Sequence, residues 1–304
     1  MNKIRRRALV TGATGYIGSQ LVMHLVKLDW EVHIVARAQS DLTALESILA
    51  ELTVHRHDGT AQGMIELVGR ARPDYVYHLA SLFLGQHDAT QLDTLVVSNV
   101  LFATQLAEAM VANGVKYLIN TGTSWQHHDN QQYKPVNLYA ATKQAFESIL
   151  EYYVDAVGLK VTTLALFDTY GPADPRNKLI SLLWNTALAQ KAIAMSPGEQ
   201  LIDLVHIDDV LAAFMIATDA IAAQPAGHSR YGVSSGAPLK LRDLVDRFAS
   251  ATGLDVPITW GGRSYRPREV MVPWTAYRVL PGWAPRIAFE NGILQTRPAD
   301  PVGR

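Results

Sequence analysis

Tyr139 and Lys143 are two residues whose types and spacing suit acid–base chemistry. They open and close the segment Tyr-Ala-Ala-Thr-Lys at the start of a predicted helix. Because residues four apart lie on the same helical face, the Lys143 ammonium can approach the Tyr139 ring. A nearby cation stabilises a phenolate and lowers the pKa of tyrosine from its unperturbed value near ~10. The spacing therefore predicts that Tyr139 donates or takes a proton.

A hydroxyl residue upstream strengthens this prediction. Thr121-Gly122-Thr123-Ser124 follows a predicted strand over 115–120. Ligands of doubly wound sheets bind at the carboxyl edge, so we expect Thr123 or Ser124 to face the crevice. A tyrosine and a lysine at this spacing are also common on exposed helix faces. The hydroxyl and a glycine-rich loop near the N-terminus favour the catalytic interpretation.

That loop is Thr-Gly-Ala-Thr-Gly-Tyr-Ile-Gly at residues 11–18, between an apolar run at 8–10 and an apolar-periodic segment that continues to Leu28. In a strand, loop and helix sequence of this kind, glycines let the backbone approach a pyrophosphate at the helix N-terminus. The spacing is Gly-x-x-Gly-x-x-Gly. The predicted dinucleotide contacts are Gly12, Thr14, Gly15, Tyr16, Ile17 and Gly18.

The end of the second predicted strand, over 31–35, indicates which dinucleotide binds. NAD sites place an Asp or Glu there for the ribose 2′-hydroxyl, whereas NADP sites place an arginine near the 2′-phosphate. Here the strand is followed by Ala36 and Arg37, with Ser40 close behind. We therefore expect NADP(H), with Arg37 and Ser40 at the phosphate. The alternative is a solvated loop arginine.

Two further strand ends are expected at the same edge. Asp58 and Gly59 follow the third predicted strand, where Asp58 either accepts from the adenine amino group or caps the helix that starts near Ala61. His78 lies in the apolar fourth strand and is expected to be a core histidine. Small residues after that strand allow a cofactor close to the sheet, and the predicted contacts are Leu79, Ala80 and Ser81.

Strands and helices alternate along the first half of the chain. The predicted strands cover 8–10, 31–35, 52–56, 75–79, 115–120 and 161–167, and the longest predicted helices cover 92–113 and 138–157. This order indicates an α/β fold with a Rossmann-type doubly wound parallel sheet and helices on both faces.

From Gly171 the pattern changes to turns, short helices and short strands, which indicates a smaller, interleaved C-terminal substrate lobe. The segment DLVHIDDV at 203–210 is expected to return to the nucleotide domain as a strand and then a helix. The expected domains are an NADP-binding domain over 1–170, with a return segment near 202–220, and a lobe over 171–304. In the lobe we expect a strand near 229–233, a helix over 239–252 and a frayed tail at 297–304.

Composition narrows the partners. The chain has 304 residues, 48% of them apolar, a net charge of −1 and no cysteine. These values give no reason to expect nucleic acid or an anionic membrane surface as a partner, and they exclude disulfide and thiolate chemistry. No run approaches the ~18 consecutive apolar residues of a membrane span, so we expect a cytoplasmic protein. His127 and His128 have no further ligand cluster at metal spacing, so no metal is expected.

Taken together, these motifs resemble the extended short-chain dehydrogenases/reductases that act on nucleotide sugars. The resemblance spans nearly the whole chain and rests on TGATGYIG, DYVYHLAS, Asn99, TGTSW, YAATK, DTYGPADPR, LVHIDDV, YRPRE and GWAPRIAFENGI. Within that superfamily, TGTSWQHH, YAATKQAFE and DTYGP are most similar to the nucleotide-sugar 4-ketoreductases of the CDP-abequose synthase group.

The resemblance implies a catalytic set of Thr123, Tyr139 and Lys143. NADPH would deliver hydride to C4 of a 4-keto-6-deoxy sugar while Tyr139 protonates the forming alkoxide. Thr123 would hold the carbonyl oxygen, and Lys143 would bond the nicotinamide ribose. Asn99 joins the residues expected at the cofactor. A homodimer is also implied, in which the two long apolar helices pair across the interface.

Departures from the family pattern restrict the reaction. In family 4,6-dehydratases the catalytic Thr is followed by Asp and Glu, whereas Ser124 and Trp125 stand here. Dehydration therefore lacks its proton carriers. Epimerases share the Thr, Tyr and Lys set but hold NAD, so epimerisation is the alternative. A sensor of NADP that does no chemistry is a minor alternative, because such proteins have typically lost the tyrosine.

The substrate diphosphate needs a cationic anchor. Many relatives carry an Asn before Tyr-Gly-Pro that bonds a substrate phosphate, but this chain has Asp168, which must point away or be paired. Arg176, Lys178 and Arg266 are the basic candidates, and Arg266 lies in the YRPRE motif. Ordinary surface charge is the alternative for Arg176 and Lys178. The predicted substrate contacts are Ser124, Asp168, Arg176, Lys178 and Arg266.

Overall fold

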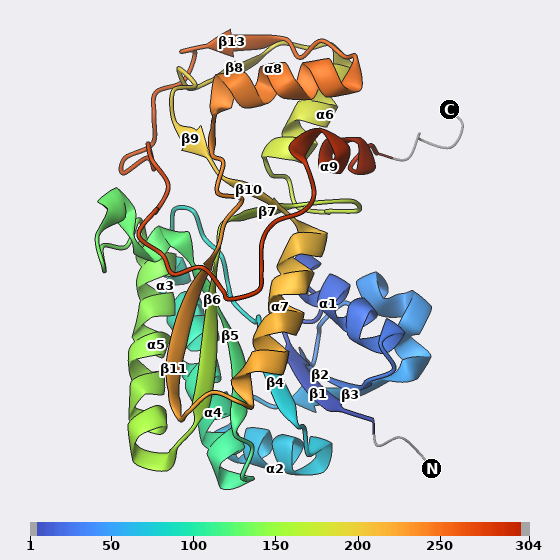
Figure 1. The fold of residues 1–304 in the computed structure, drawn as a ribbon, viewed down its shortest axis with the longest axis vertical. Helices are drawn as coiled ribbons and strands as arrows, with labels where there is room; N and C mark the ends of the chain where they lie inside the picture. Colours follow the sequence, from blue (N-terminus) through green and yellow to red (C-terminus); the bar gives the residue numbers. More distant parts are fainter. Residues whose placement is uncertain (1–4, 299–304) are drawn as a thin grey trace.

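Seven parallel strands form the centre of the molecule (Figure 1). The structure is a computed structural model and describes residues 5–298. The order across the sheet is β11, β6, β5, β4, β1, β2 and β3, as in a doubly wound nucleotide-binding fold. The expected fold class is confirmed. The strands are β1 (Arg7–Thr11), β2 (Glu31–Arg37), β3 (Leu52–His57), β4 (Tyr75–His78), β5 (Tyr117–Thr123), β6 (Lys160–Leu166) and β11 (Gly227–Val233).

Both faces of this sheet are buried under helices. In β1, Ala8 and Val10 belong to one core cluster and Leu9 to the other, because successive side chains of a strand alternate between faces. Burial on both faces explains why the central strands are continuous apolar runs. One layer holds α1 (Tyr16–Lys27) and α7 (Ile207–Ile221), and the other holds α2 (Ala61–Ala71), α4 (Phe102–Ala112) and α5 (Leu138–Val157).

The carboxyl ends of the strands make one functional edge. β1 lies between β2 and β4, so the strand order reverses at β1 and the chain leaves a crevice there. The glycine loop follows β1 at this edge, and Thr123 ends β5 two strands away. The fold thus brings the two predicted parts of the site to the same side of the sheet.

The predicted helix over 92–113 is divided in the structure. It consists of α3 (Leu92–Val96), a π-helical turn η3 (Val97–Leu101) and α4. By length and composition the segment Ala89–Ala112 could cross a membrane, and 44% of its most apolar window is buried inside the fold. Its inner side packs against α2 and α5, so it is a core helix of this domain with an apolar outer side.

The smaller lobe lies beyond the carboxyl edge, at the top of Figure 1. Its own apolar core joins the helices to short strand pairs, β8 with β13 and β9 with β12. β7 (Asp168–Tyr170) and β10 (Leu204–His206) pair with each other between the lobe and the sheet. The lobe elements are α6 (Leu179–Ala189), β8 (Ile193–Met195), β9 (Leu201–Ile202), β12 (Leu239–Lys240), α8 (Leu241–Thr252), β13 (Ile258–Trp260) and α9 (Phe289–Gln295).

The return of the chain to the nucleotide domain differs from the expectation. The predicted return strand is β10, which pairs with β7 and not with the main sheet. The helix α7 does pack on the sheet, and β11, which we expected in the lobe, forms the sheet edge beside β6. The return segment therefore extends to Val233, beyond residue 220. Of the tail expected at 297–304, residues 299–304 lie outside the described part of the chain.

Candidate active site

Glycine at position 12 lets the loop after β1 pack tightly against the backbone that follows β4. Gly12 has φ +71°, and a Cβ at this position would lie 2.5 Å from the Ala80 nitrogen, so only glycine fits there. Gly15 is the N-cap of α1, with no side-chain cap and no acidic residue in the first turn. The amides at this helix start are free to meet a phosphate, which is the fit that a dinucleotide cofactor requires.

A cavity of about 270 Å³ joins this loop to Thr123 and Tyr139, and Lys143 does not line it. It extends from the N-terminus of α1 across the ends of β4 and β5 to the start of α5. Most of the predicted cofactor and substrate contacts line this single space. The residues from those predictions that line it are Gly12, Gly15, Tyr16, Ile17, Gly18, Leu79, Ser81, Thr123, Ser124, Tyr139, Asp168, Arg176 and Lys178.

Thr123 is fixed at the last position of β5. Its backbone nitrogen donates to Gln126 Oε1 at 2.8 Å, and its Oγ1 accepts from the Trp125 nitrogen at 3.3 Å. This reciprocal capping box starts the short 3₁₀ turn Ser124–Gln126. The Thr123 hydroxyl proton is not used in this motif, so the hydroxyl can still donate into the cavity.

Tyr139 is the second residue of α5. Asn137 caps this helix by accepting from the Ala140 nitrogen at 3.0 Å, and Gly158 ends it in the left-handed region at φ 73°. The Tyr139 ring packs edge to face on Phe83, with centroids 5.0 Å apart. Burial raises the pKa of Tyr139 to about 12, against a smaller lowering by the Ser81 hydroxyl.

Lys143 lies one turn further along α5 and is only 3% exposed. Burial lowers the pKa of Lys143 to about 8, and Glu147 partly offsets this effect. Among the described residues Lys143 Nζ has no hydrogen-bond partner. The expectation that the pKa of Tyr139 lies below its usual value is therefore wrong for this structure, because burial of the phenol raises it.

The predicted NADP determinant lies at the end of β2. The Arg37 nitrogen donates to Ser40 Oγ at 2.9 Å, and within residues 5–298 the Arg37 guanidinium forms no ion pair or hydrogen bond. Arg56 on β3 donates to the Arg37 carbonyl at 2.6 Å and braces the turn through the carbonyls of Ala38 and Ser40. Sequence reasoning missed Arg56, which is exposed on β3 at the edge of the sheet.

Asp58 has a different capping role from the one proposed. The N-cap of α2 is Thr60, whose side chain accepts from the Gly63 nitrogen at 2.9 Å. Asp58 Oδ1 in turn accepts from Thr60 N and Oγ1, both at 2.9 Å, and these bonds lower the pKa of Asp58. Asp58 thus orders the cap without forming it. Gly59, at φ +92°, presents its carbonyl to Gln105 Nε2 at 2.9 Å.

Asn99 does not have a free group for a cofactor. Its Oδ1 accepts from Ser81 Oγ at 3.1 Å and from the Leu82 nitrogen at 2.7 Å, and its Nδ2 donates to the Leu82 carbonyl and Thr142 Oγ1. The carboxamide has two donors and two acceptor positions, and all four are used. The expectation of a direct contact is corrected: Asn99 positions the 81–82 backbone beside the cavity.

Three other residues named in the predictions, His78, Ala80 and Thr14, lie near the loop but do not line the cavity. His78 is buried, its Nδ1 lies 2.8 Å from Thr11 Oγ1, and burial holds its pKa well below the usual range. The same Thr11 hydroxyl accepts from the Ala80 nitrogen at 3.2 Å, which places Ala80 in the wall behind Gly12. Thr14 is exposed at the tip of the loop and does not line the cavity.

All three candidate anchors for a diphosphate have carboxylate partners. Arg176 pairs with Asp174 through two bonds of 2.7 Å and donates to the Thr169 carbonyl. Lys178 lies 3.4 Å from Asp168, so Asp168 is paired, as its place near a diphosphate requires. Arg266 pairs with Glu269 at 3.0 Å, and this bond raises the pKa of Arg266. Arg176 is the most constrained of the three, which favours a structural role for it.

Comparisons with known proteins show which family the chain belongs to. The model of the NAD dependent epimerase/dehydratase family matches residues 8–232. The chain belongs to this family. CDP-abequose synthase from Salmonella muenchen is 23% identical over 297 residues, which covers 96% of this chain and 97% of that protein. UDP-glucose 4-epimerase from Mycolicibacterium smegmatis is 27% identical over 312 residues, which covers 95% and 97%.

A solved structure extends the comparison. MoeE5 in complex with UDP-glucuronic acid and NAD is 26% identical, with a TM-score of 0.80 over 96% of this chain and 97% of that chain. Family membership confirms the expected superfamily, and with it the expectation of an NAD(P)-dependent enzyme.

Two aromatic residues, Phe83 and Trp125, form part of the wall of the cleft. Trp125 lines the central cavity and two adjoining cavities on the lobe side, and Asp168 lines all three with it. Phe83 packs on Trp125 with centroids 5.6 Å apart, and the Arg266 guanidinium lies 5.9 Å from the Trp125 ring. Sequence reasoning missed Phe83, because a lone aromatic in an irregular segment carries no local signal.

Proposed function

We propose that the protein reduces a 4-keto-6-deoxy nucleotide sugar with NADPH. The observation that supports this best is the composition of the central cavity. Thr123 and Tyr139 share it with the glycine loop, while the two positions after Thr123 hold the Ser124 hydroxyl and the Trp125 indole. The site therefore has groups that bind and protonate a carbonyl oxygen, and an aromatic wall where an eliminating enzyme needs a carboxylate.

In this reaction NADPH supplies a hydride to the carbonyl carbon of the sugar. The Thr123 hydroxyl donates to the carbonyl oxygen and orients it, since its Oγ1 accepts from Trp125 N and leaves the proton free. Tyr139 then donates its proton to the forming alkoxide. A raised pKa keeps the phenol protonated at neutral pH, so the group is in the correct state to act as an acid.

Lys143 provides a buried positive charge on α5, one helical turn after Tyr139. With a pKa of about 8 it is mainly protonated at pH 7, and its ammonium stabilises negative charge that develops on the Tyr139 oxygen as the proton leaves. Burial of this ammonium strengthens the interaction, because the surroundings screen charge less than water does.

The cofactor is proposed to be NADP(H). Arg37 ends β2 without a partner in the described part of the chain, and Arg56 fixes the turn that carries it. A free guanidinium at this place can pair with a 2′-phosphate through two parallel bonds. The MoeE5 structure contains NAD. The proposed preference of this chain for NADP(H) therefore rests on the chain's own residues and not on that comparison.

Arg266 is the proposed anchor of the substrate diphosphate. It lines two adjoining cavities of the cleft, it is paired with Glu269, and it lies over Trp125. Lys178, balanced by Asp168, is the second cation near the same space. Arg266 binds Glu269 through Nε and Nη2, and its side chain is 59% exposed, so Nη1 can still meet a diphosphate in the cleft.

An epimerase is the second candidate. Three relatives of similar length are named UDP-glucose 4-epimerase, and Thr123, Tyr139 and Lys143 would serve that chemistry equally well. The free Arg37 disfavours it, since epimerases hold NAD. An NADP sensor without turnover is a minor candidate, because the complete set of three residues would have no use in it.

We also propose a cytoplasmic homodimer. The outer side of the helix over 92–112 exposes Leu92, Val96, Val97 and Leu101, which is more apolar surface than a helix facing water carries. The neighbouring helix α5 adds Tyr152 and Val157. A second copy of the chain would cover both helices.

The experiment that separates these functions measures both cofactor and sugar. The enzyme is incubated with NADPH and a panel of 4-keto-6-deoxy sugars linked to CDP, dTDP, UDP or GDP, and separately with UDP-glucose and NAD⁺. A reductase consumes one NADPH for each sugar reduced. An epimerase converts UDP-glucose without net consumption of NAD⁺, and a sensor turns over none of them. A crystal soaked with NADP and the accepted sugar would identify the base that the lobe recognises.

A further inference from the structure

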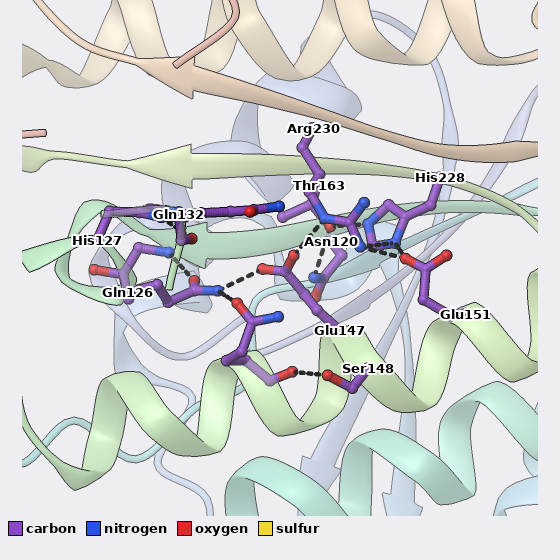
Figure 2. Close-up of polar contacts among 12 residues, drawn as sticks. Asn120, Gln126, His127, Gln132, Glu147, Ser148, Glu151, Thr163, His228 and Arg230 are labelled. Carbon is purple, nitrogen blue, oxygen red and sulfur yellow. Dashed lines mark hydrogen bonds and ion pairs between the residues drawn. The ribbon is translucent and has the colours of Figure 1, made fainter. Parts of the chain in front are cut away.

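A buried polar network lies behind the catalytic residues, between α5 and β11. Figure 2 shows the Glu147 carboxylate between the Gln126 amide and the Arg230 guanidinium. Glu147 is 3% exposed, and such a charge is costly to bury unless its oxygens are paired. The two carboxylate oxygens have different partners. Oε1 accepts from Gln126 Nε2 at 2.8 Å, and Oε2 accepts from Arg230 Nε at 2.9 Å.

The network is continuous to the rim of the sheet. Arg230 also binds Glu151, and His228 Nδ1 lies 2.8 Å from Glu151 Oε1. His228 Nε2 lies 2.7 Å from Thr163 Oγ1 in β6. Arg230 has a raised pKa: burial acts to lower it, but the bonds to Glu151 and Glu147 outweigh burial. Arg230 therefore remains the cation that balances Glu147.

One branch of this network reaches the hydroxyl residue of the active site. Gln126, whose Nε2 donates to Glu147 Oε1 at 2.8 Å and to Gln144 Oε1 at 2.9 Å, accepts from the Thr123 nitrogen at 2.8 Å through its Oε1. Gly122 makes the close approach possible, since a Cβ there would lie 3.1 Å from both Gln126 Oε1 and Glu147 Oε1. The orientation of the Thr123 backbone thus depends on a carboxylate of α5.

The other branch acts on Lys143. Glu147 follows Lys143 by four residues, so their side chains share a helical face. The titratable groups around Lys143 are Tyr139 and Glu147 on α5 and His78 on β4, and His78 is neutral. Glu147 is the anionic group of this set and opposes the loss of the Lys143 proton that burial promotes.

We infer that Glu147, held by Arg230, is a positioning residue that fixes Thr123 through Gln126 and keeps Lys143 in its cationic form. The inference rests on the proposed function for its catalytic meaning, but both links are properties of the protein itself. A purely structural role would not require an ion pair at this place, since a buried pair can often be replaced by apolar residues without loss of stability.

The test compares three variants with the wild type. Glu147→Gln removes the charge and keeps the shape. Glu151→Gln makes the same charge change on the same helix, at a partner of the same Arg230, one turn further from Lys143, and is the matched control. Gln126→Leu cuts the link to Thr123 and leaves the charge of Glu147 in place. Protein with ¹³C-labelled lysine reports the titration of Lys143 directly, with the resonance assigned by Lys143→Met.

In Glu147→Gln the Lys143 midpoint is expected to move to lower pH, and kcat with NADPH and the accepted 4-keto sugar is expected to fall roughly 10- to 100-fold at pH 7.5. Glu151→Gln is expected to leave the midpoint and kcat unchanged. Gln126→Leu is expected to lower kcat without moving the midpoint. An unchanged midpoint in Glu147→Gln, or an equal shift in Glu151→Gln, would overturn the inference.

Two further measurements keep the test decisive. If Glu147→Gln does not fold, the double variant Glu147→Leu with Arg230→Met removes both charges together, and it must show the same downward shift or the inference fails. If the wild type reduces none of the sugars in the panel, the proposed function fails, while the resonance of Lys143 still decides the effect of Glu147.

Discussion

Tyr139 and Lys143 share one face of α5, and burial moves their pKa values apart, to about 12 for the phenol and about 8 for the ammonium. At neutral pH the phenol keeps its proton and the lysine keeps its charge. This pairing of states suits a group that gives a proton to a forming alkoxide. The reduction of a ketone needs such a proton donor, whereas the oxidation of an alcohol would need the phenolate.

The pH dependence of the reaction follows from this pairing. Because the pKa of Lys143 is lowered to about 8, its charged form predominates below that value and is lost above it. We expect kcat for sugar reduction to be level near pH 7 and to fall as pH rises through about 8. A rate that stays level to pH 10 would contradict the role assigned to the Lys143 charge.

Tyr139→Phe removes the acid and keeps the ring that packs on Phe83. Loss of a positioned general acid costs roughly 10²- to 10⁴-fold in rate, so kcat should fall by that factor. The Kd for NADPH, measured by fluorescence titration, should change little. Near-normal turnover in this variant would refute the proton transfer from Tyr139.

Arg37→Asp tests the choice of cofactor. The substitution replaces a cation by an anion at the end of β2, where the Arg37 nitrogen and Ser40 still hold the turn. We expect kcat/KM with NADPH to fall roughly 10- to 100-fold, which is the loss of a charge-assisted bond, and kcat/KM with NADH to stay the same or rise. An unchanged preference between the two cofactors would show that Arg37 is a solvated loop residue.

Arg266 and Glu269 give a pair of opposite predictions. Arg266→Met removes the proposed diphosphate anchor and should raise KM for the nucleotide sugar roughly 10- to 100-fold. Glu269→Gln frees Arg266 from its partner at 3.0 Å and should lower KM by roughly 2- to 5-fold. Arg263→Met is the control, because Arg263 lies in the same loop but lines none of the three cavities of the cleft. If Arg266→Met and Glu269→Gln both keep the wild-type KM, Arg266 is not the diphosphate anchor.

The proposed dimer depends on the apolar outer side of the helix over 92–112. Leu101 is 47% exposed there, and a glutamate at this position places two like charges into a symmetric interface. Leu101→Glu should convert the dimer to a monomer in light scattering. Leu28→Glu, at a residue 49% exposed near the end of α1, should leave the mass unchanged. A wild-type chain of monomer mass would refute the proposal at once.

Local signals explain which elements were predictable from the sequence. The helix α5 matches its predicted bounds because Asn137 and Gly158 are strong caps with short-range mechanisms. The strand, glycine loop and helix at the N-terminus were also predictable, since each step is encoded within a few residues. The same reasoning brought Thr123 and Tyr139 to one edge of the sheet.

Long-range pairing explains what the sequence could not predict. Arg230 binds Glu147 across 83 positions, and β11 joins the sheet beside β6, neither of which leaves a local pattern. The carboxylate partner of Arg176 lies two residues away, but only the fold of the 171–178 segment brings them together. The raised pKa of Tyr139 likewise depends on burial, which the helical spacing does not report.

The central claim is that hydride passes from NADPH to a ketone carbon of a nucleotide sugar while Tyr139 supplies the proton. The most direct measurement uses NADPH with deuterium at both C4 positions of the nicotinamide, the accepted 4-keto-6-deoxy nucleotide sugar, and mass and NMR analysis of the product. The account predicts one deuterium on sugar C4 for each NADPH oxidised in the wild type, and loss of this transfer in Tyr139→Phe. A sugar product without deuterium, formed while NADPH is unchanged, would contradict it.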